Sequence, residues 1–482
     1  MKEDKLHIIH KVLAELNIGE VEKRPDTSER LKEALETALA NMGPVLDQAG
    51  SNEYLKIDSL SVEVSLPSAK LDQLDGELEK AIRKKINELI PSELSAESAE
   101  QEPVKFDRLP DEERYQELFR TFLMTGSLPW WADREMFLDL ETWLDELPVP
   151  EWLSISESIL HNEPRAAVRL TAQFPKSLIR KLIRQSLQER FGDERLLLLR
   201  DQIISFLEAE EFPEVGYQEI DSTLYTRLIY GISTGLGGDE LAGRLFQQTV
   251  KEIKQGTEDQ KAEEGLLKSF RKRLMTGEFQ GSQKLLDQIA EKSYDSSGEL
   301  SADEMQLTEE ELQEAEGEQV SHAGLVLLHP FLPNYFKNLG YLEKSEFINE
   351  AARERAVCLM HHLATGDEEF PEFELILPKF LCEWSLEEPV KRYLPLTDAE
   401  KTESVKLLES CIQHWDALKS TGIDGLRQNF IRRDGILRKE PFGWSLYVER
   451  NTHDILLQKL PWNLSVMKLP WMDEMLTVHW IS

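Results

Sequence analysis

Six prolines lie between residues 129 and 213 of the stretch 111–294, which otherwise has the apolar spacing of amphipathic helices. A proline inside a helix removes a backbone hydrogen bond and clashes with the preceding turn, so helices tend to end or begin near it. Turns are therefore predicted at Pro129, Pro148, Pro150, Pro164, Pro175 and Pro213. The stretch is therefore predicted to be almost entirely amphipathic helix, with turns at these prolines.

Residues 1–92 are predicted to form a small α+β module. The apolar residues of 5–16 lie on one helical stripe, and a second helix is predicted from about Ser28. Residues 53–67 alternate apolar and polar side chains, which is typical of a half-buried strand. A third helix is predicted over residues 71–89 and completes the module.

Residues 321–482 are predicted to form a second α+β domain, with helices over 345–364, 371–383 and 398–419. Further on, Asp434-Gly435 is a common hairpin-turn sequence, and the segments after it alternate with a period of two. A short antiparallel sheet backed by helices is the simplest arrangement. The predicted fold class is therefore mainly α, with small α+β terminal modules and a helical middle.

Two segments are predicted to be linkers between these parts. Residues 93–110 are rich in Ser, Glu and Pro and poor in large apolar side chains. Residues 295–319 hold ten acidic and no basic residues, a block that repels itself and indicates an acidic linker over 295–320. The length of 482 residues agrees with such a division, since it suggests about two to four domains.

The chain is strongly acidic, with 90 acidic and 56 basic residues and a formal net charge of -34. This charge repels nucleic acid and anionic lipid, so neither is an expected partner. A basic protein surface is one expected partner, and solubility alone is an equally good explanation of the charge. No window approaches the ~20 apolar residues of a membrane span and the N-terminus is not a secretory signal, so the protein is expected in the cytoplasm during synthesis and assembly.

No catalytic, cofactor-binding or metal-binding residue is predicted, and the protein is not expected to be an enzyme. Cys358, Cys382 and Cys411 stand singly in apolar surroundings and are expected to be buried free thiols. Adjacent histidines on a helix point about 100° apart, so His361 and His362 are expected to be structural or solvated rather than ligands of one ion. The glycine-rich residues 234–240 lack a phosphate-binding lysine and are predicted to join two helices.

Three Leu-Pro-Trp corners mark the two ends of the chain. Proline fixes its own backbone and extends the residue before it, which holds the following tryptophan at a defined angle. Two interpretations stay open: these tryptophans fill domain cores, or some of them anchor a partner, since tryptophan is common at interface hot spots. The candidate partner-contact residues are Trp130, Trp131, Trp462, Trp471 and Trp480.

A second repeated feature is a helix that ends in Thr-Gly, at residues 125–126, 275–276 and 365–366. Glycine there can adopt the left-handed conformation that closes a helix. The resemblance of residues 119–129 to 270–280 suggests a duplicated helical unit, although any helix can end this way.

Several motifs in the last third of the chain resemble those of the tape measure proteins of contractile injection systems. They are LLHPFLPNYFKNLGYL, ARERAVCLMHHLATG, PEFELILPKFLC, LPLTDAE, HWDALKSTGIDGLRQNFIRRDGIL and LPWNLSVMKLPWMDEMLTVHW. The segments HIIHKVLAELNI, LKIDSLSVEVS and FLMTGSLPWW resemble the N-terminal part of the same family. Residues 150–294 contribute nothing to the resemblance.

The resemblance implies a non-enzymatic assembly protein without a cofactor, which sits in or is threaded through the growing tube of the particle and sets its length. Its partners would be tube and baseplate proteins. The whole chain as one helix would reach only about 720 Å, and its prolines, sheet and tryptophan-rich ends mean that much of it cannot be a single rod. The part between these ends, residues 111–294, would give roughly 270 Å if fully stretched as helix. An alternative is therefore an assembly chaperone or baseplate factor that binds tube or effector subunits.

Overall fold

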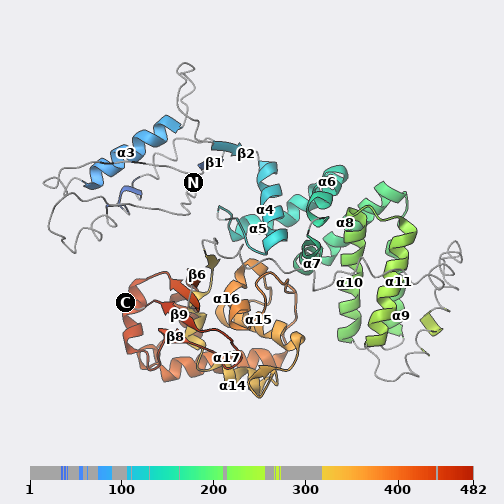
Figure 1. Cartoon of the computed structure of the whole chain (residues 1–482). Helices are drawn as coiled ribbons and strands as arrows, with labels where there is room; N and C mark the ends of the chain where they lie inside the picture. Colours follow the sequence, from blue (N-terminus) through green and yellow to red (C-terminus); the bar gives the residue numbers. More distant parts are fainter. Residues whose placement is uncertain are drawn as a thin grey trace. The chain divides into compact units, whose positions relative to one another are not determined.

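The computed structural model describes residues 74–89, 106–109, 111–129, 131–161, 163–209, 214–255, 317–440 and 443–480, together with residues 34, 35, 37–39, 41, 54–57, 62, 64, 265, 268–270 and 272. The chain divides into two compact units. The first comprises residues 1–119 and 128–137, and the second comprises residues 120–127 and 138–482. Figure 1 shows the elements in chain order.

The first unit holds a two-stranded antiparallel sheet and helix α3 (Leu74–Leu89). Strand β1 (Tyr54–Ile57) pairs with β2 (Phe106–Leu109), so the end of the predicted linker 93–110 is a strand. A cluster of buried residues joins α3 to a short helical stretch near residue 34, which lies in the second predicted helix; its members are Ala34, Ala38, Leu78 and Ile82. The predicted first helix, residues 5–16, lies outside the described residues.

The helical part runs from α4 (Asp111–Thr125) to α11, with prolines at the helix starts. Pro150 lies in the first turn of α6, Pro164 begins α7, and Pro175 caps α8. Residues 234–237 connect α10 to α11, as predicted. Helix α10 packs against α7, α8, α9 and α11 (Figure 1). The remaining bounds are α5 Arg134–Glu146, α6 Val149–Leu160, α7 Pro164–Gln173, α8 Lys176–Phe191, α9 Arg195–Ala209, α10 Glu214–Ser233 and α11 Gly238–Gln255.

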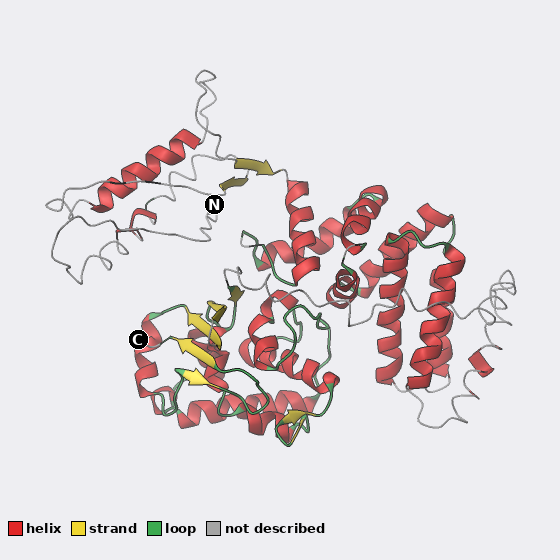
Figure 2. Ribbon diagram, in the orientation of Figure 1, coloured by secondary structure: helices red, strands yellow, loops and turns green. Residues whose placement is uncertain are grey.

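The C-terminal part packs helices beside a five-stranded sheet of order β3-β6-β7-β9-β8 (Figure 2). The strands are β3 Glu318–Val320, β6 Gly435–Glu440, β7 Gly443–Val448, β8 Val466–Met467 and β9 Leu476–His479; β4 Leu342–Glu343 and β5 Glu346–Phe347 form a separate hairpin. The α-helices are α14 Leu332–Asn338, α15 Glu350–Thr365, α16 Ile376–Leu381, α17 Asp398–His414 and α18 Ile423–Leu426. The 3-10 helices are η3 Ala323–Leu328, η4 Glu372–Glu374, η5 Asp416–Leu418 and η7 Thr452–Lys459, and η6 Arg427–Ile431 is a π-helical turn.

The mainly α fold with a small C-terminal sheet agrees with the prediction, but two details of the sheet differ. The sheet is mixed, because β7 and β9 are parallel, with Trp444 opposite Leu476; the long connection through η7 and β8 returns the chain in the same direction. Asp434-Gly435 is not a hairpin turn. Gly435 is itself paired with Val448, and a Cβ there would lie 2.6 Å from the carbonyl oxygen of Tyr447. Glycine is used here for close backbone approach.

Two of the three Thr-Gly helix ends lie in the described residues, and they share one geometry. Gly126 and Gly366 have φ of 77° and 83°, and each backbone N–H donates to the carbonyl four residues earlier, both at 2.8 Å. The hydroxyls of Thr125 and Thr365 donate to carbonyls one turn back and accept from the N–H two residues on. The predicted closure by left-handed glycine is confirmed at both ends, and the predicted end at 275–276 lies outside the described residues.

One apolar core runs through the C-terminal part. It includes the fully buried Trp415, which packs on Phe430 with ring centroids 4.9 Å apart. Cys358, Cys382 and Cys411 are buried free thiols within this core, as predicted, and burial raises the pKa of each. Among the helices that the structure describes, none combines the length and apolar character that a membrane crossing needs.

Candidate functional site: the junction between α7 and η4

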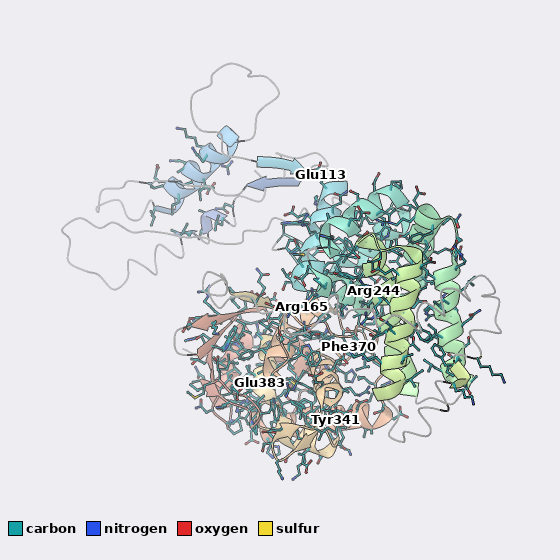
Figure 3. All side chains as sticks on the ribbon, turned by 45° about the vertical axis from the view of Figure 1, so that its right-hand side comes forward. Glu113, Arg165, Arg244, Tyr341, Phe370 and Glu383 are labelled. Carbon is teal, nitrogen blue, oxygen red and sulfur yellow. The ribbon has the colours of Figure 1, made fainter. Side chains whose placement is uncertain are left out.

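Helix α7 buries polar side chains on the face that would ordinarily be apolar. Glu163 caps its first turn by accepting from the N–H of Arg165, whose guanidinium, labelled in Figure 3, pairs with Glu387. The buried face includes Arg169 and Gln173, both fully shielded from solvent. Buried arginine and glutamine are costly unless every polar atom finds a partner, so their surroundings define a site.

Arg169 ties three distant segments together. Its Nε lies 3.0 Å from Oε2 of Glu372 on η4, and its two terminal nitrogens donate to the carbonyls of Leu123 and Glu387. The exposed fractions of the Arg169 and Glu372 side chains are 0% and 1%. A guanidinium suits this position because its fork of donors reaches acceptors in several directions at once.

Glu372 is shared between two cations. Its other oxygen, Oε1, accepts from Nζ of Lys379 on α16 at 2.6 Å, and this ammonium also donates to the carbonyl of Leu386 at 2.9 Å. Burial lowers the pKa of Lys379, while the carboxylate of Glu372 opposes that shift. The charge of Glu388 also acts to raise the pKa of Lys379, and burial raises the pKa of Glu388 itself. The cluster therefore depends on one carboxylate held between two buried cations.

Gln173 and Arg392 complete the junction through backbone groups. The amide of Gln173 donates to the carbonyl of Val390 at 2.6 Å and accepts from the N–H of Glu372 at 3.0 Å. The Arg392 N–H and guanidinium donate to the carbonyls of Ala172 and Gln173, and the guanidinium also reaches Glu141 at 2.7 Å. These contacts satisfy carbonyls that the end of α7 leaves unpaired. We call Arg169, Gln173, Glu372, Lys379 and Arg392 the α7 junction.

The α7 junction is suited to holding structure together rather than to catalysis. Its charged groups are enclosed and point at one another, so none is presented to a substrate. Sequence reasoning missed these residues. The available signal was the run PEFELILPKFLC, which places two glutamates and a lysine inside an otherwise apolar segment.

The predicted tryptophan sites lie in different environments. Trp471 and Trp480 are buried, and their indole nitrogens donate to the carbonyl of Leu381 at 2.8 Å and to Asp454 at 3.2 Å. Trp462 is half-buried against Phe331, with centroids 5.3 Å apart. Within the first unit, Trp131 is half-buried with the guanidinium of Arg114 over its ring, and Trp130 lies outside the described residues. Within the second unit, Trp462, Trp471 and Trp480 contact different partners.

The two adjacent histidines of α15 face different partners, as their helical spacing predicts. The Nδ1 of His362 lies 2.9 Å from the carbonyl of Asp367, whereas Nε2 of His361 lies 2.6 Å from Oε2 of Glu374. His322 lies beside them, with its Nε2 3.6 Å from the same oxygen. His322, His361 and Glu374 could hold a metal ion, and the sequence analysis singled out neither His322 nor Glu374.

Comparison with known proteins places the chain in a family. No curated protein and no solved structure matched it. The family described as contractile injection system tape measure protein matches residues 6–480. The match runs through both terminal regions that resembled this family, and also through residues 150–294, which had contributed no motif. The chain belongs to the contractile injection system tape measure protein family.

Proposed function

We propose that this protein is a non-enzymatic assembly factor that works as a folded body, binding tube or baseplate proteins while the inner tube of the particle is built. The observation that carries the proposal is the α7 junction. It joins a helix of the middle region to the C-terminal core through a fully buried Arg169–Glu372–Lys379 cluster. Family membership supports the structural role in a contractile injection system.

The energetics of the junction favour action in the folded state. To extend the middle region as a rod, α7 would have to leave the C-terminal part. That would separate Arg169 from Glu372, and stretching the region would also part α7 from α10, on which it packs. Removing one partner of a buried ion pair typically costs about 3–5 kcal/mol when the other charge stays buried. The helices are also short, since the longest of α4 to α11 would span about 30 Å.

The second candidate function is determination of tube length, which the family name favours. An extended ruler would require the helices of residues 111–294 to separate and stretch, to about 270 Å if continuous. The two functions differ in one measurable respect. A ruler makes tube length depend on the length of the middle region, whereas a folded factor does not.

Insertion of about 40 helix-forming residues between Glu258 and Lys268 tests this difference. We expect particles of unchanged tube length at normal yield, measured by electron microscopy. An increase of about 60 Å, the helical rise of the insert, would instead establish a ruler. A Gly/Ser insert of equal length is the matched control, because it adds chain without adding a stiff element. The ruler predicts a smaller and broader increase for this control.

A binding measurement tests the proposed partner class. The net charge of -34 predicts that purified tube or baseplate subunits with a basic face bind the protein at low salt and release it at high salt. Analytical ultracentrifugation at two salt concentrations would detect the complex. Absence of any complex with either class of subunit at low salt would contradict the proposed function.

A further inference from the structure

Three buried side chains from separate elements meet near η4. The glutamate of this cluster is Glu374, not the Glu372 of the α7 junction. His322 precedes η3, His361 lies on α15, and Glu374 ends η4. One nitrogen or oxygen from each lies within 4.8 Å of the others. The two imidazole rings have centroids 5.3 Å apart and an interplanar angle of 60°, so their edges can converge on one point.

His322 is left without a hydrogen bond in this cluster. Its exposed fraction is 6%, and neither ring nitrogen has a hydrogen-bond partner among the residues that the structure describes. A buried imidazole that makes no hydrogen bond loses hydration without replacement, which is unfavourable. A ligand placed between His322 and Glu374 would remove that cost.

The surroundings of His361 leave one nitrogen available to the cluster. Its Nδ1 lies 3.4 Å from the hydroxyl oxygen of Thr365. That hydroxyl donates its proton to the carbonyl of His361, so it can accept from Nδ1–H. The Nε2 of His361 faces Oε2 of Glu374 at 2.6 Å, a distance at which Nε2–H can donate to the carboxylate while no metal ion is bound. When the proton lies on Nδ1 and is donated to Thr365 instead, Nε2 has a lone pair that it can offer to a metal ion.

We propose that His322, His361 and Glu374 bind one Zn²⁺ ion. Two imidazoles and one carboxylate are a donor set that zinc uses in proteins, with water in the fourth position. Tetrahedral zinc places its ligand atoms about 3.3 Å apart, and Oε2 of Glu374 lies 2.6 Å from Nε2 of His361 and 3.6 Å from Nε2 of His322, on either side of that value. Binding displaces any proton shared by His361 and Glu374. Thr365 supplies the outer contact that orients His361.

The zinc site is an addition to the proposed assembly function, because the bound ion would crosslink segments within the C-terminal domain. It would link η3, α15 and η4, and η4 also carries Glu372 of the α7 junction. Zinc would therefore stabilise the segment on which α7 docks. The role is structural, since all three ligands are buried.

The test uses the full chain, unfolded with a chelator and refolded with or without ZnCl₂. Mass spectrometry of metal content and competition with a chromophoric chelator measure zinc. We expect one zinc per chain and a higher thermal midpoint with zinc. His322→Ala should weaken zinc binding at least about tenfold and abolish the thermal shift. The side chain of His322 makes no hydrogen bond that the substitution would remove, so this variant is expected to fold.

His362→Ala is the matched control, because it removes the adjacent buried histidine that faces Asp367 instead of the cluster. It should bind zinc as the wild type does. Glu374→Gln is a second test, which retains a polar group beside His361 and removes the anionic ligand. Substitution with Co²⁺ should give the visible bands of a tetrahedral site without a thiolate charge-transfer band, since no cysteine is a ligand.

Wild-type protein that takes up no stoichiometric zinc on refolding would overturn the proposal. So would zinc binding that persists at wild-type affinity in both His322→Ala and Glu374→Gln. A thiolate band in the cobalt spectrum would assign the metal to cysteine and reject this site.

Discussion

Nε of Arg169 and Oε2 of Glu372 lie 3.0 Å apart in the interior of the protein, although 203 residues separate them in the chain. The pair is shielded from water on both sides, with 0% and 1% of the side chains exposed. Because Lys379 shares the same carboxylate, the loss of Glu372 affects two buried cations at once. Glu372 is therefore the residue on which the α7 junction depends most.

Glu372→Gln should destabilise the second unit by about 3–5 kcal/mol, because Arg169 and Lys379 would remain buried without a counter-charge. Urea unfolding followed by circular dichroism measures the change. The control is Glu369→Gln, whose side chain is 56% exposed and pairs with Arg392; it should cost less than about 1 kcal/mol. Equal losses of unfolding free energy in the two variants would show that the buried cluster stabilises the protein no more than an exposed ion pair does.

Glu400 gives the protein a predicted acid sensitivity. It is buried, which disfavours its charge, but hydrogen bonds from Arg355, Tyr341 and Thr397 prevail and lower its pKa to about 2 (Tyr341 is labelled in Figure 3). Since its ordinary pKa is 4.5, this carboxylate stabilises the fold fully above that pH, and the contribution is lost as pH falls from 4.5 toward 2. The contribution is on the order of 1–3 kcal/mol.

Glu400→Gln checks this assignment, because glutamine does not titrate. The variant should be less stable than wild type at pH 7, and the difference should shrink as pH falls from 5 to 3. Unfolding midpoints in urea at several pH values measure both curves. Curves that stay parallel over this range would assign the acid sensitivity to other carboxylates.

Gly126→Ala should destabilise more than a left-handed conformation alone explains. Both Gly126 and Gly192 have positive φ at helix ends, 77° and 72°. A Cβ at Gly192 meets nothing within 4 Å, whereas one at Gly126 would lie 2.6 Å from Oε1 of Glu372. We expect about 1 kcal/mol for Gly192→Ala from backbone strain. For Gly126→Ala we expect about 2–4 kcal/mol, since the ion-paired Glu372 cannot yield freely.

The difference between the unfolding free energies of these two variants measures the cost of the contact between the new Cβ at position 126 and Glu372. Equal losses would mean that the Glu372 side chain moves aside at little cost, and would weaken the description of the junction as rigid.

The three cysteines should be unreactive in the native protein. Each is fully buried, and burial raises the pKa of all three thiols, that of Cys411 to about 12. Thiolate, the reactive form, is therefore scarce at pH 8. A thiol reagent such as DTNB should label none within minutes in buffer and all three in guanidinium chloride. Rapid labelling of even one in the native state would contradict their burial.

Local signals made several parts of the fold predictable. Pro164 and Pro175 stand at helix starts because proline lacks the N–H that a first turn leaves unpaired. Gly126 and Gly366 close helices because left-handed backbone favours glycine. In each case the physical cause lies within a few residues, so the sequence pattern is sufficient.

The α7 junction and the histidine cluster could not be predicted in this way. Arg169 meets Glu372, and His322 meets Glu374, through contacts between segments far apart in the chain. An arginine at a buried helix position has the same local pattern as one that faces solvent. The parallel pairing of β7 with β9 is non-local for the same reason, since alternation identifies a strand but not its neighbour.

The tryptophans offer the final prediction, because their environments separate the two interpretations of the Leu-Pro-Trp corners. Trp471 is buried between Phe336 and Phe347 and donates to a backbone carbonyl. Trp471→Ala should therefore destabilise the protein by about 3–5 kcal/mol. Trp462 is half-buried, and its indole nitrogen has no hydrogen-bond partner among the described residues. Trp462→Ala should cost less, about 1–2 kcal/mol, because less surface is lost from the core.

Comparing stability with particle yield then tests the proposed partner contact at Trp462. Stability is measured by urea unfolding, and yield by counting assembled particles in electron micrographs. A Trp462→Ala protein that is folded but supports few particles would identify Trp462 as a partner contact, since its stability loss is the smaller one. Yield that follows stability alone in both variants would assign Trp462 and Trp471 equally to the core. The hot-spot property of tryptophan predicts the first outcome, because the half-buried ring still offers apolar surface to a partner.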